Sequence, residues 1–278
     1  MKKINRRSFL AAAGLTAAAL ALTACGGSAS STASSTASSA ASSEAASTSA
    51  AAELTTVEAG KLTMATNAAF PPYEMTTDAG EFEGIDIETA QAIADKLGLE
   101  LQIDDMDFDA ALLSVQQGKA DIVMAGVTVT DERKAVMDFS DSYATGIQSI
   151  IVPEGSDIAS PDDLAGKKIG TQRGTTGYIY CSDDFGDENV VAYDDGLTAV
   201  QALNNGQVDA VVIDNAPAQE FVAANPGLKV LDTSYAEEDY AIGMAKGSSL
   251  EDVVNAALEE LKADGTLQSI VDKYITAE

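Results

Sequence analysis

Residues 114–124 read SVQQGKADIVM and residues 202–212 read ALNNGQVDAVV, so one pattern returns after 88 residues. In each copy a helix-like segment is followed by a glycine (Gly118 or Gly206), a tight turn, an aspartate and an apolar strand. Glycine ends a helix here because it adopts the left-handed conformation without a steric penalty. Two equivalent units predict two similar α/β lobes whose strands deliver their C-terminal residues to a shared crevice.

The residues that follow these two strands are the first candidates for a site. In the first copy they are Ala125 to Thr128, and in the second copy the strand at 209–213 ends at Asp214. The run before Asp214 is almost wholly apolar, so its carboxylate emerges at the end of a buried strand. The alternative is that Asp214 caps a helix from Asn215 onward.

Apolar periodicity extends the alternation of helices and strands along the chain. A helix is predicted from an N-cap at Asp86 to Gly98, and others at 111–117, after Thr130 and, as the final helix, from Ser249. Strands are predicted at 61–65, 99–103, 121–125, 148–152, 168–170, 190–192 and 209–213. The pattern is that of an α/β fold with mostly parallel strands.

The charge balance excludes several kinds of function. The chain has 278 residues, with 16 Lys and Arg against 44 Asp and Glu, and a formal net charge of −28. Such a surface repels nucleic-acid phosphates and anionic lipid headgroups, so we expect no nucleic-acid partner. The chain contains no histidine, which removes His-based catalysis and the commonest transition-metal ligands. We therefore expect no metal site and no cofactor.

The first 53 residues are typical of an export signal followed by a tether. Residues 1–24 combine a basic start with an apolar stretch, as in a signal peptide. The sequence LTAC at 22–25 resembles a lipobox, in which Cys25 is lipidated; the alternative is an ordinary signal peptide with an incidental cysteine. Both Sec and twin-arginine export stay open. Residues 25–53 are then a lipidated Cys and a disordered Ser/Ala/Thr tether, and the exported protein would sit at the outer or periplasmic face of the cell membrane.

Several motifs of the remaining body occur in a fixed order. They are NAAFPPY at 67–73, GIDIE at 84–88, DFD at 107–109, GVTVTDER at 126–133, DFSD at 138–141, GTT at 174–176 and VDAVVID at 208–214. Together they closely resemble the amino-acid-binding branch of the family 3 extracellular solute-binding proteins, which are receptors of ABC importers. The resemblance implies a receptor that captures an amino acid and delivers it to an importer permease.

The same resemblance implies a two-lobed periplasmic-binding-protein fold of type II. Lobe 1 would comprise 54–145 and 241–278, and lobe 2 would comprise 146–240. Two hinge strands would cross between the lobes near 145–151 and 234–240, and the lobes would close on the ligand.

Arg133 is the first candidate for contact with the ligand. If Thr130 caps the helix, Arg133 lies in the first turn, where the helix dipole prefers anions. A cation at this position is explained if its guanidinium group binds a carboxylate that the helix N-terminus also attracts. The alternative is that Arg133 is a solvated surface arginine. The resemblance implies that Arg133 grips the ligand α-carboxylate, helped by the hydroxyl of Thr128 and by backbone N–H groups of Gly126 and Thr176.

For the rest of the ligand, the resemblance implies that Asp214 and the carbonyl of Ala125 bind the α-ammonium. It places the ligand side chain between Phe70 and Phe108. Core packing is the alternative for both rings, but Phe70 precedes two prolines and Phe108 sits in a turn between two aspartates. Tyr73 is a weaker third candidate.

Two departures from the family pattern bear on the ligand. Asn67 stands where relatives that bind cationic or amide side chains often carry Asp, so the anion that would pair with a basic ligand is missing. Arg173 beside the GTT loop either faces an acidic or polar side chain or is solvated. The sequence therefore favours a neutral polar or acidic amino acid.

We expect a monomer that is not an enzyme. The main alternative is an exported lyase or dehydratase on the same fold, which would need a cleft acid with a raised pKa, with Glu74, Asp86 or Glu88 as candidates. A sensory receptor for an amino acid is the other alternative. Cys181 is the only cysteine of the body, so it cannot form an internal disulfide there.

Overall fold

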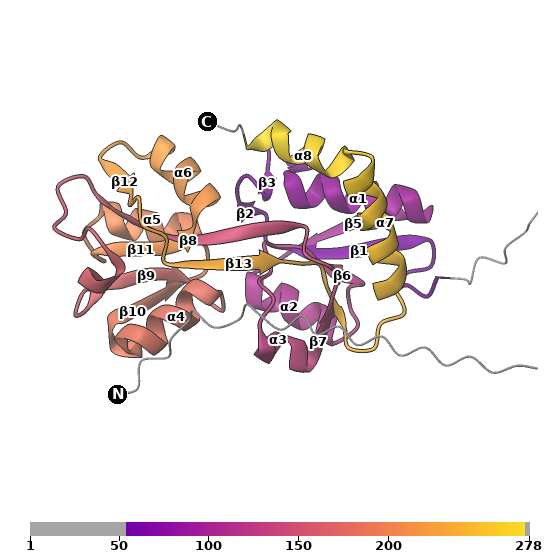
Figure 1. Ribbon diagram of the computed structural model, residues 1–278, viewed down its shortest axis with the longest axis horizontal. Helices are drawn as coiled ribbons and strands as arrows, with labels where there is room; N and C mark the ends of the chain where they lie inside the picture. The colour runs from indigo at the N-terminus through magenta and orange to yellow at the C-terminus, as the bar shows by residue number, and fades with distance from the viewer. Residues whose placement is uncertain (1–53, 276–278) are drawn as a thin grey trace, which may run out of the picture. The chain divides into compact units, whose positions relative to one another are not determined.

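The computed structural model describes residues 54–275, so the predicted signal peptide, Cys25 and tether lie outside the described residues. Two large β-sheets, each with helices on both faces, make up most of this part of the chain (Figure 1). Between residues 54 and 275, no helix has the length and apolar character needed to cross a membrane.

The first large sheet has the strand order β5-β1-β6-β14-β7. Its strands are β1 (Lys61–Thr66), β5 (Glu100–Asp105), β6 (Ile122–Val123), β7 (Met137–Phe139) and β14 (Gly243–Ala245). Helices α1 (Ile85–Leu97), α7 (Glu251–Ala263) and α8 (Thr266–Tyr274) cover one face, and α2 (Phe108–Gln116) covers the other. Leu62 and Met64 of β1 pack toward α1 and Ala65 packs toward α2, because successive strand residues point to opposite faces. We call this sheet and its helices lobe 1.

Lobe 1 also contains a small β-sheet and a short helix. A three-stranded sheet consists of β2 (Ala69–Phe70), β3 (Glu74–Thr76) and β4 (Phe82–Glu83). The short helix α3 (Asp131–Val136) precedes β7.

The second large sheet, which we call lobe 2 with its helices, has the order β10-β9-β11-β8-β12, and β13 pairs with β8. Its strands are β8 (Ala144–Pro153), β9 (Ile169–Gln172), β10 (Val190–Tyr193), β11 (Ala210–Asp214), β12 (Leu228–Val230) and β13 (Ala236–Tyr240). Helices α5 (Gly196–Asn204) and α6 (Asn215–Ala224) pack on one face, and α4 (Thr176–Phe185) packs on the other. Two 3₁₀ turns, Pro161–Leu164 and Asp187–Asn189, complete the lobe.

The long strand β8 and its antiparallel partner β13 run between the lobes (Figure 1). Their register pairs Ala144 with Tyr240 and Gln148 with Ala236. We propose the division into 54–145 with 241–278 and 146–240, which cuts the chain at the end of this ladder nearest lobe 1.

The repeated pattern folds as expected. Helix α2 is followed by Gly118 with φ +65° and by β6, and helix α5 is followed by Gly206 with φ +67° and by β11. Gly98 likewise ends α1 in the left-handed conformation. The expectation of mostly parallel strands is wrong. Within residues 54–275, four of the eleven strand pairings are parallel (β1 with β5 and β6, β9 with β10 and β11), and the other seven are antiparallel. The direction of a strand depends on its tertiary partner, which side-chain periodicity does not encode.

Three helix predictions need correction. The N-cap of α1 is Gly84, not Asp86; a Cβ at Gly84 would lie 2.2 Å from the carbonyl oxygen of Tyr73, so close packing fixes this start. Helix α7 begins after Leu250 rather than Ser249, and it is not the last helix, because Gly265 separates α8 from it. Phe108 is the first residue of α2, not part of a turn.

Candidate ligand site between the lobes

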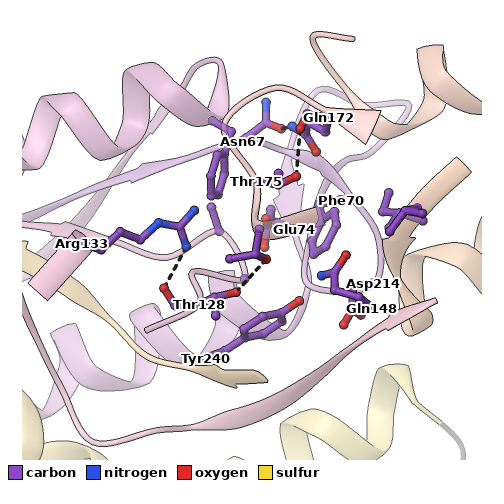
Figure 2. Close-up of a pocket in the computed structure, with 16 residues that line it drawn as sticks. Asn67, Phe70, Glu74, Thr128, Arg133, Gln148, Gln172, Thr175, Asp214 and Tyr240 are labelled. Atoms are coloured by element: carbon purple, nitrogen blue, oxygen red, sulfur yellow. Dashed lines mark hydrogen bonds between the residues drawn. The ribbon is translucent and has the colours of Figure 1, made fainter. Parts of the chain in front are cut away.

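A cavity lies where the ends of β6, β9 and β11 meet β8 and β13 (Figure 2). The cavity is lined by Asn67, Phe70, Glu74, Phe108, Ala125, Gly126, Thr128, Arg133, Gln148, Gln172, Thr175, Thr176, Val212, Ile213, Asp214 and Tyr240. All nine residues that the sequence analysis assigned to a ligand belong to this lining, so the fold brings them together.

Arg133 supplies the positive charge of the cavity. Thr130 caps α3 as predicted, its hydroxyl oxygen accepting from the backbone N–H of Arg133 at 3.1 Å. The side chain of Arg133 is 8% exposed, and its guanidinium lies 5.4 Å from the ring centroid of Phe108. The guanidinium donates to the carbonyl oxygens of Thr128 (2.8 Å) and Gly174 (3.1 Å) and forms no salt bridge with any described residue. A buried cation without a salt bridge is costly, so this arrangement favours an anionic group from a ligand.

Asp214 supplies a negative charge from lobe 2. It ends β11 and is 2% exposed. Its two carboxylate oxygens accept from the backbone N–H groups of Ile147 (2.8 Å) and Ala216 (3.0 Å). The second contact is the N-cap of α6, so both roles considered for Asp214 are combined in one side chain. Burial raises the pKa of Asp214 to about 6, although the two N–H donors oppose the shift.

Direct contacts across the cavity hold the lobes together. Gln172 of β9 donates its side-chain N–H to the amide oxygen of Asn67 at 2.8 Å. The contact from Arg133 to Gly174 and the approach of the Thr128 and Thr176 hydroxyl oxygens, 3.4 Å apart, also join lobe 1 to lobe 2. The structure therefore describes a closed arrangement of the two lobes.

Comparison with known families identifies this architecture. Residues 62–277 match the model of the bacterial extracellular solute-binding proteins, family 3. The chain belongs to that family.

Relatives of this solute-binding protein match over most of the chain. A probable histidine-binding protein of Neisseria gonorrhoeae is 32% identical over 99% of the chain and 98% of its own length. The arginine-, lysine-, histidine-binding protein of Geobacillus stearothermophilus has a similar structure, with 34% identity, a TM-score of 0.75, and coverage of 78% of this chain and 96% of its own. An ancestral arginine-binding protein bound to glutamine is 42% identical, with a TM-score of 0.75 and coverage of 78% and 99%.

The aromatic side chains of the solute-binding protein divide between cavity and core. Phe70 is half-buried, packs against hydrophobic clusters of both lobes, and stacks on Tyr73 with ring centroids 5.7 Å apart. Phe108 lines the cavity and also packs in the hydrophobic core beside α2, and its contact with a ligand stays a prediction. Tyr73 is buried and is not part of the cavity lining, where Tyr240 of β13 appears instead.

Of the three acids considered for catalysis, only Glu74 lines the cavity. Asp86 lies behind it, fully buried, and accepts from the hydroxyl of Tyr143 (2.8 Å) and the N–H of Gly126 (3.0 Å). Burial and the neighbouring Asp86 raise the pKa of Glu74 well above its usual range, and burial raises the pKa of Asp86 to about 6. Glu88 contacts Lys273 and Tyr274 away from the cavity.

Sequence reasoning did not assign Glu74, Gln148, Gln172, Thr175, Val212, Ile213 and Tyr240 to the ligand site. Gln172 ends β9, so the rule that sites form at the C-terminal ends of parallel strands could have found it. Glu74 and Tyr240 carry no such signal, because the antiparallel strands β3 and β13 bring them to the cavity. Arg173 is exposed and lies 3.5 Å from Asp194, outside the lining, and Cys181 is buried under β9 and β11.

Proposed function

We propose that this solute-binding protein captures an α-amino acid between its lobes and delivers it to the permease of an ABC importer. One observation carries the proposal: a buried Arg133 without an anionic partner and a buried Asp214 line the same cavity from opposite lobes. A zwitterion satisfies both charges, its carboxylate reaching the guanidinium and its ammonium reaching Asp214. The names of the relatives support an amino-acid ligand, and family membership favours a receptor over the exported lyase or dehydratase.

In this proposal the backbone completes the recognition of the zwitterion. The N–H group of Thr176 assists Arg133, and the carbonyl of Ala125 assists Asp214. In this structure the N–H of Gly126 donates to Asp86 at 3.0 Å and the hydroxyl of Thr128 donates to Glu238 at 3.0 Å, so each must share or redirect its hydrogen to assist Arg133. Gly126 has φ +55°, and a Cβ there would lie 2.9 Å from the ring of Phe70. Because glycine has no Cβ, the backbone of residue 126 and the ring of Phe70 can both lie close to the same ligand.

The part of the cavity that would hold the ligand side chain is lined by a carboxyl group and two side-chain amides. Glu74 is fully buried, and among the described residues its two oxygens accept from no hydrogen-bond donor, although its carboxyl approaches Asp86. Asn67 and Gln172 present an amide pair beside it. A cationic side chain beside Glu74 would lower the raised pKa of this carboxyl and pair with it, and a neutral polar side chain would hydrogen-bond to it, so a basic or neutral polar ligand suits the cavity better than an acidic one. This proposal differs from the preference for neutral polar or acidic ligands that the sequence drew from Asn67 and Arg173.

A thermal-shift screen of the ligand-free protein against the twenty amino acids tests the proposal. A ligand at 100 times its Kd adds about 2.7 kcal/mol to the free energy of unfolding. We expect L-arginine, L-lysine, L-histidine or L-glutamine to stabilise the protein, and L-aspartate and L-glutamate to have little effect. Titration calorimetry then measures the Kd of each hit. If no amino acid stabilises the protein, the proposal is wrong.

Binding is expected to depend on pH through Asp214. A carboxyl with a pKa of about 6 is only about one-tenth ionised at pH 5, and the ligand ammonium needs the ionised form. The affinity should therefore rise about tenfold between pH 5 and pH 7, where a free amino acid keeps its zwitterionic backbone. Calorimetric titrations at both pH values measure this change. A Kd that is the same at pH 5 and pH 7 would contradict it.

The stability of the ligand-free protein should move in the opposite direction. Asp214 and Asp86 each have a pKa raised by burial from 3.8 to about 6, so the folded chain binds their protons more tightly than the unfolded chain does. Their contribution to the free energy of unfolding therefore decreases as the pH rises from about 4 to about 6. Urea denaturation across this range checks the sign.

We also propose that residues 1–24 are removed on export and that a lipidated Cys25, followed by the tether 25–53, anchors the receptor to the membrane. An acyl chain contributes about 0.8 kcal/mol per buried CH₂, and two chains hold a protein stably on a bilayer. Cys25→Ser should release the protein into the medium or periplasm, as cell fractionation would show. A soluble wild-type protein whose Cys25 is unmodified by mass spectrometry would contradict the anchor.

A further inference from the structure

A buried carboxylate on a hinge strand lies just behind the cavity. Glu238 belongs to β13, and its side chain is 6% exposed, whereas its neighbours Glu237 and Asp239 are exposed. Since β13 forms a ladder with β8, Glu238 is held by the strand pair that runs between the lobes. Its position is therefore tied to the hinge.

One oxygen atom of Glu238 accepts hydrogen bonds from three different segments of the chain. Its Oε2 accepts from the hydroxyl of Thr128 in lobe 1 at 3.0 Å and from the hydroxyl of Thr176 at the start of α4 in lobe 2 at 2.9 Å. It also accepts from the side-chain amide of Gln148 on β8 at 3.0 Å. All three donors line the cavity. The other oxygen, Oε1, is buried and has no hydrogen-bond partner among the described residues.

The charge of Glu238 also reaches the ligand-binding charges. Burial lowers the pKa of Arg133, and the nearby Glu238 opposes this shift more than any other group. Glu238 adds to the rise in the pKa of Asp214 that burial causes. The carboxylate therefore lies within electrostatic reach of both groups proposed to bind the zwitterion.

We propose that Glu238 is a positioning residue that couples lobe closure to the geometry of the ligand site. Thr128 and Thr176 can share one carboxylate oxygen only while the two lobes are closed, so opening breaks at least one of these hydrogen bonds. In the closed form the same contacts fix the directions of both hydroxyl groups at the cavity wall. Charge-assisted hydrogen bonds of this kind are stronger than neutral ones, and a buried carboxylate that loses them is costly. Glu238 thus favours the closed form and orients two hydroxyl groups of the cavity wall.

A distance measurement between the lobes in the absence of ligand tests this inference independently of the proposed amino acid. Nitroxide labels on p-acetylphenylalanine at the exposed positions Val136 in lobe 1 and Leu197 in lobe 2 leave both native cysteines unchanged. Electron–electron double resonance then compares the full chain with Glu238→Ala and Glu238→Gln. The matched control is Glu237→Gln, which changes an exposed acid on the same strand.

We expect the ligand-free Glu238→Ala protein to shift toward a different, broader interlobe distance distribution, and Glu237→Gln to match the parent chain. Glu238→Gln keeps an acceptor oxygen without the charge, so its distribution should be intermediate. Glu238→Gln also provides the test of the inference if the alanine variant fails to fold. Stopped-flow measurements with L-arginine should show dissociation at least tenfold faster from Glu238→Ala than from the control.

Two results would overturn the inference. One is a Glu238→Ala or Glu238→Gln protein whose ligand-free distance distribution equals that of Glu237→Gln. The other is an unchanged dissociation rate of L-arginine in both Glu238 variants. If the parent chain binds no amino acid, the proposed function fails, and the ligand-free distances still decide the role of Glu238.

Discussion

Replacing Arg133 by methionine is expected to weaken amino-acid binding by about a hundredfold. Removing one member of a buried, hydrogen-bonded charge pair costs about 2–5 kcal/mol, and a hundredfold change in Kd corresponds to about 2.7 kcal/mol. Methionine keeps an unbranched apolar stem but lacks the guanidinium that lies over the ring of Phe108, so it cannot hold a carboxylate. Calorimetric titration with L-arginine, or with the tightest ligand of the amino-acid screen, measures the loss.

The same variant should also lose discrimination between the amino acid and its α-amide. In the parent protein the amide is expected to bind more weakly because it leaves the Arg133 charge uncompensated, and in Arg133→Met this penalty should disappear. Arg173→Met is the matched control, because Arg173 is exposed and its contact with Asp194 is at the surface. An Arg133→Met protein with parental affinity and parental discrimination would show that the cavity does not recognise a carboxylate through Arg133.

Asp214→Asn is expected to reduce affinity at least tenfold by removing the negative charge that we propose receives the ligand ammonium. A hydrogen bond to a charged group contributes about 1.5–3 kcal/mol, and the ligand ammonium would otherwise be buried without an anion. The penalty for a deamino analogue of the ligand should be smaller in Asp214→Asn than in the parent chain. Because the variant no longer titrates at this position, its affinity should also change less between pH 5 and pH 7.

The chain offers a close structural control for this variant. Asp195 caps α5 in lobe 2 and, like Asp214, accepts two hydrogen bonds, in its case from the N–H and hydroxyl of Thr198. Asp195 is not part of the cavity lining. In Asp195→Asn the amide oxygen still caps α5, so this variant should reproduce only the exchange of a capping carboxylate for an amide, without the loss of affinity. Equal affinities in the two variants would refute a role for Asp214 in binding.

Local sequence patterns were sufficient for the elements whose ends are set by local chemistry. Gly98, Gly118 and Gly206 end helices because only glycine accepts positive φ without strain, and Thr130 caps α3 because its hydroxyl reaches the N–H of Arg133. The repeated helix–turn–strand unit predicted two lobes with a shared crevice. The motif resemblance then identified nine residues that the fold brings to one cavity, although it leaves their individual roles to binding experiments.

Tertiary structure alone decided features that depend on partners distant in the sequence. Asp86 was predicted to cap α1, but it turns inward toward Tyr143 and Gly126, and the tight approach of Gly84 to Tyr73 sets the helix start instead. The antiparallel strand β14 enters the first sheet more than a hundred residues after β6, and no local pattern specifies that pairing.

The acids of the cavity were only partly identified from the sequence, which considered Glu74 as a cleft acid for catalysis but not Glu238. Asn67 suggested that the site lacks an anion for a basic ligand, whereas the fold places Glu74 in the cavity lining and Glu238 directly behind it. Among 44 acidic residues, periodicity cannot single out those that turn inward on short or hinge strands. The sequence by itself determined the lobes, the strand ends and the residues of the predicted zwitterion site. Packing between the lobes decided which further charges are buried beside them, because burial is a property of the assembled fold and not of any one segment.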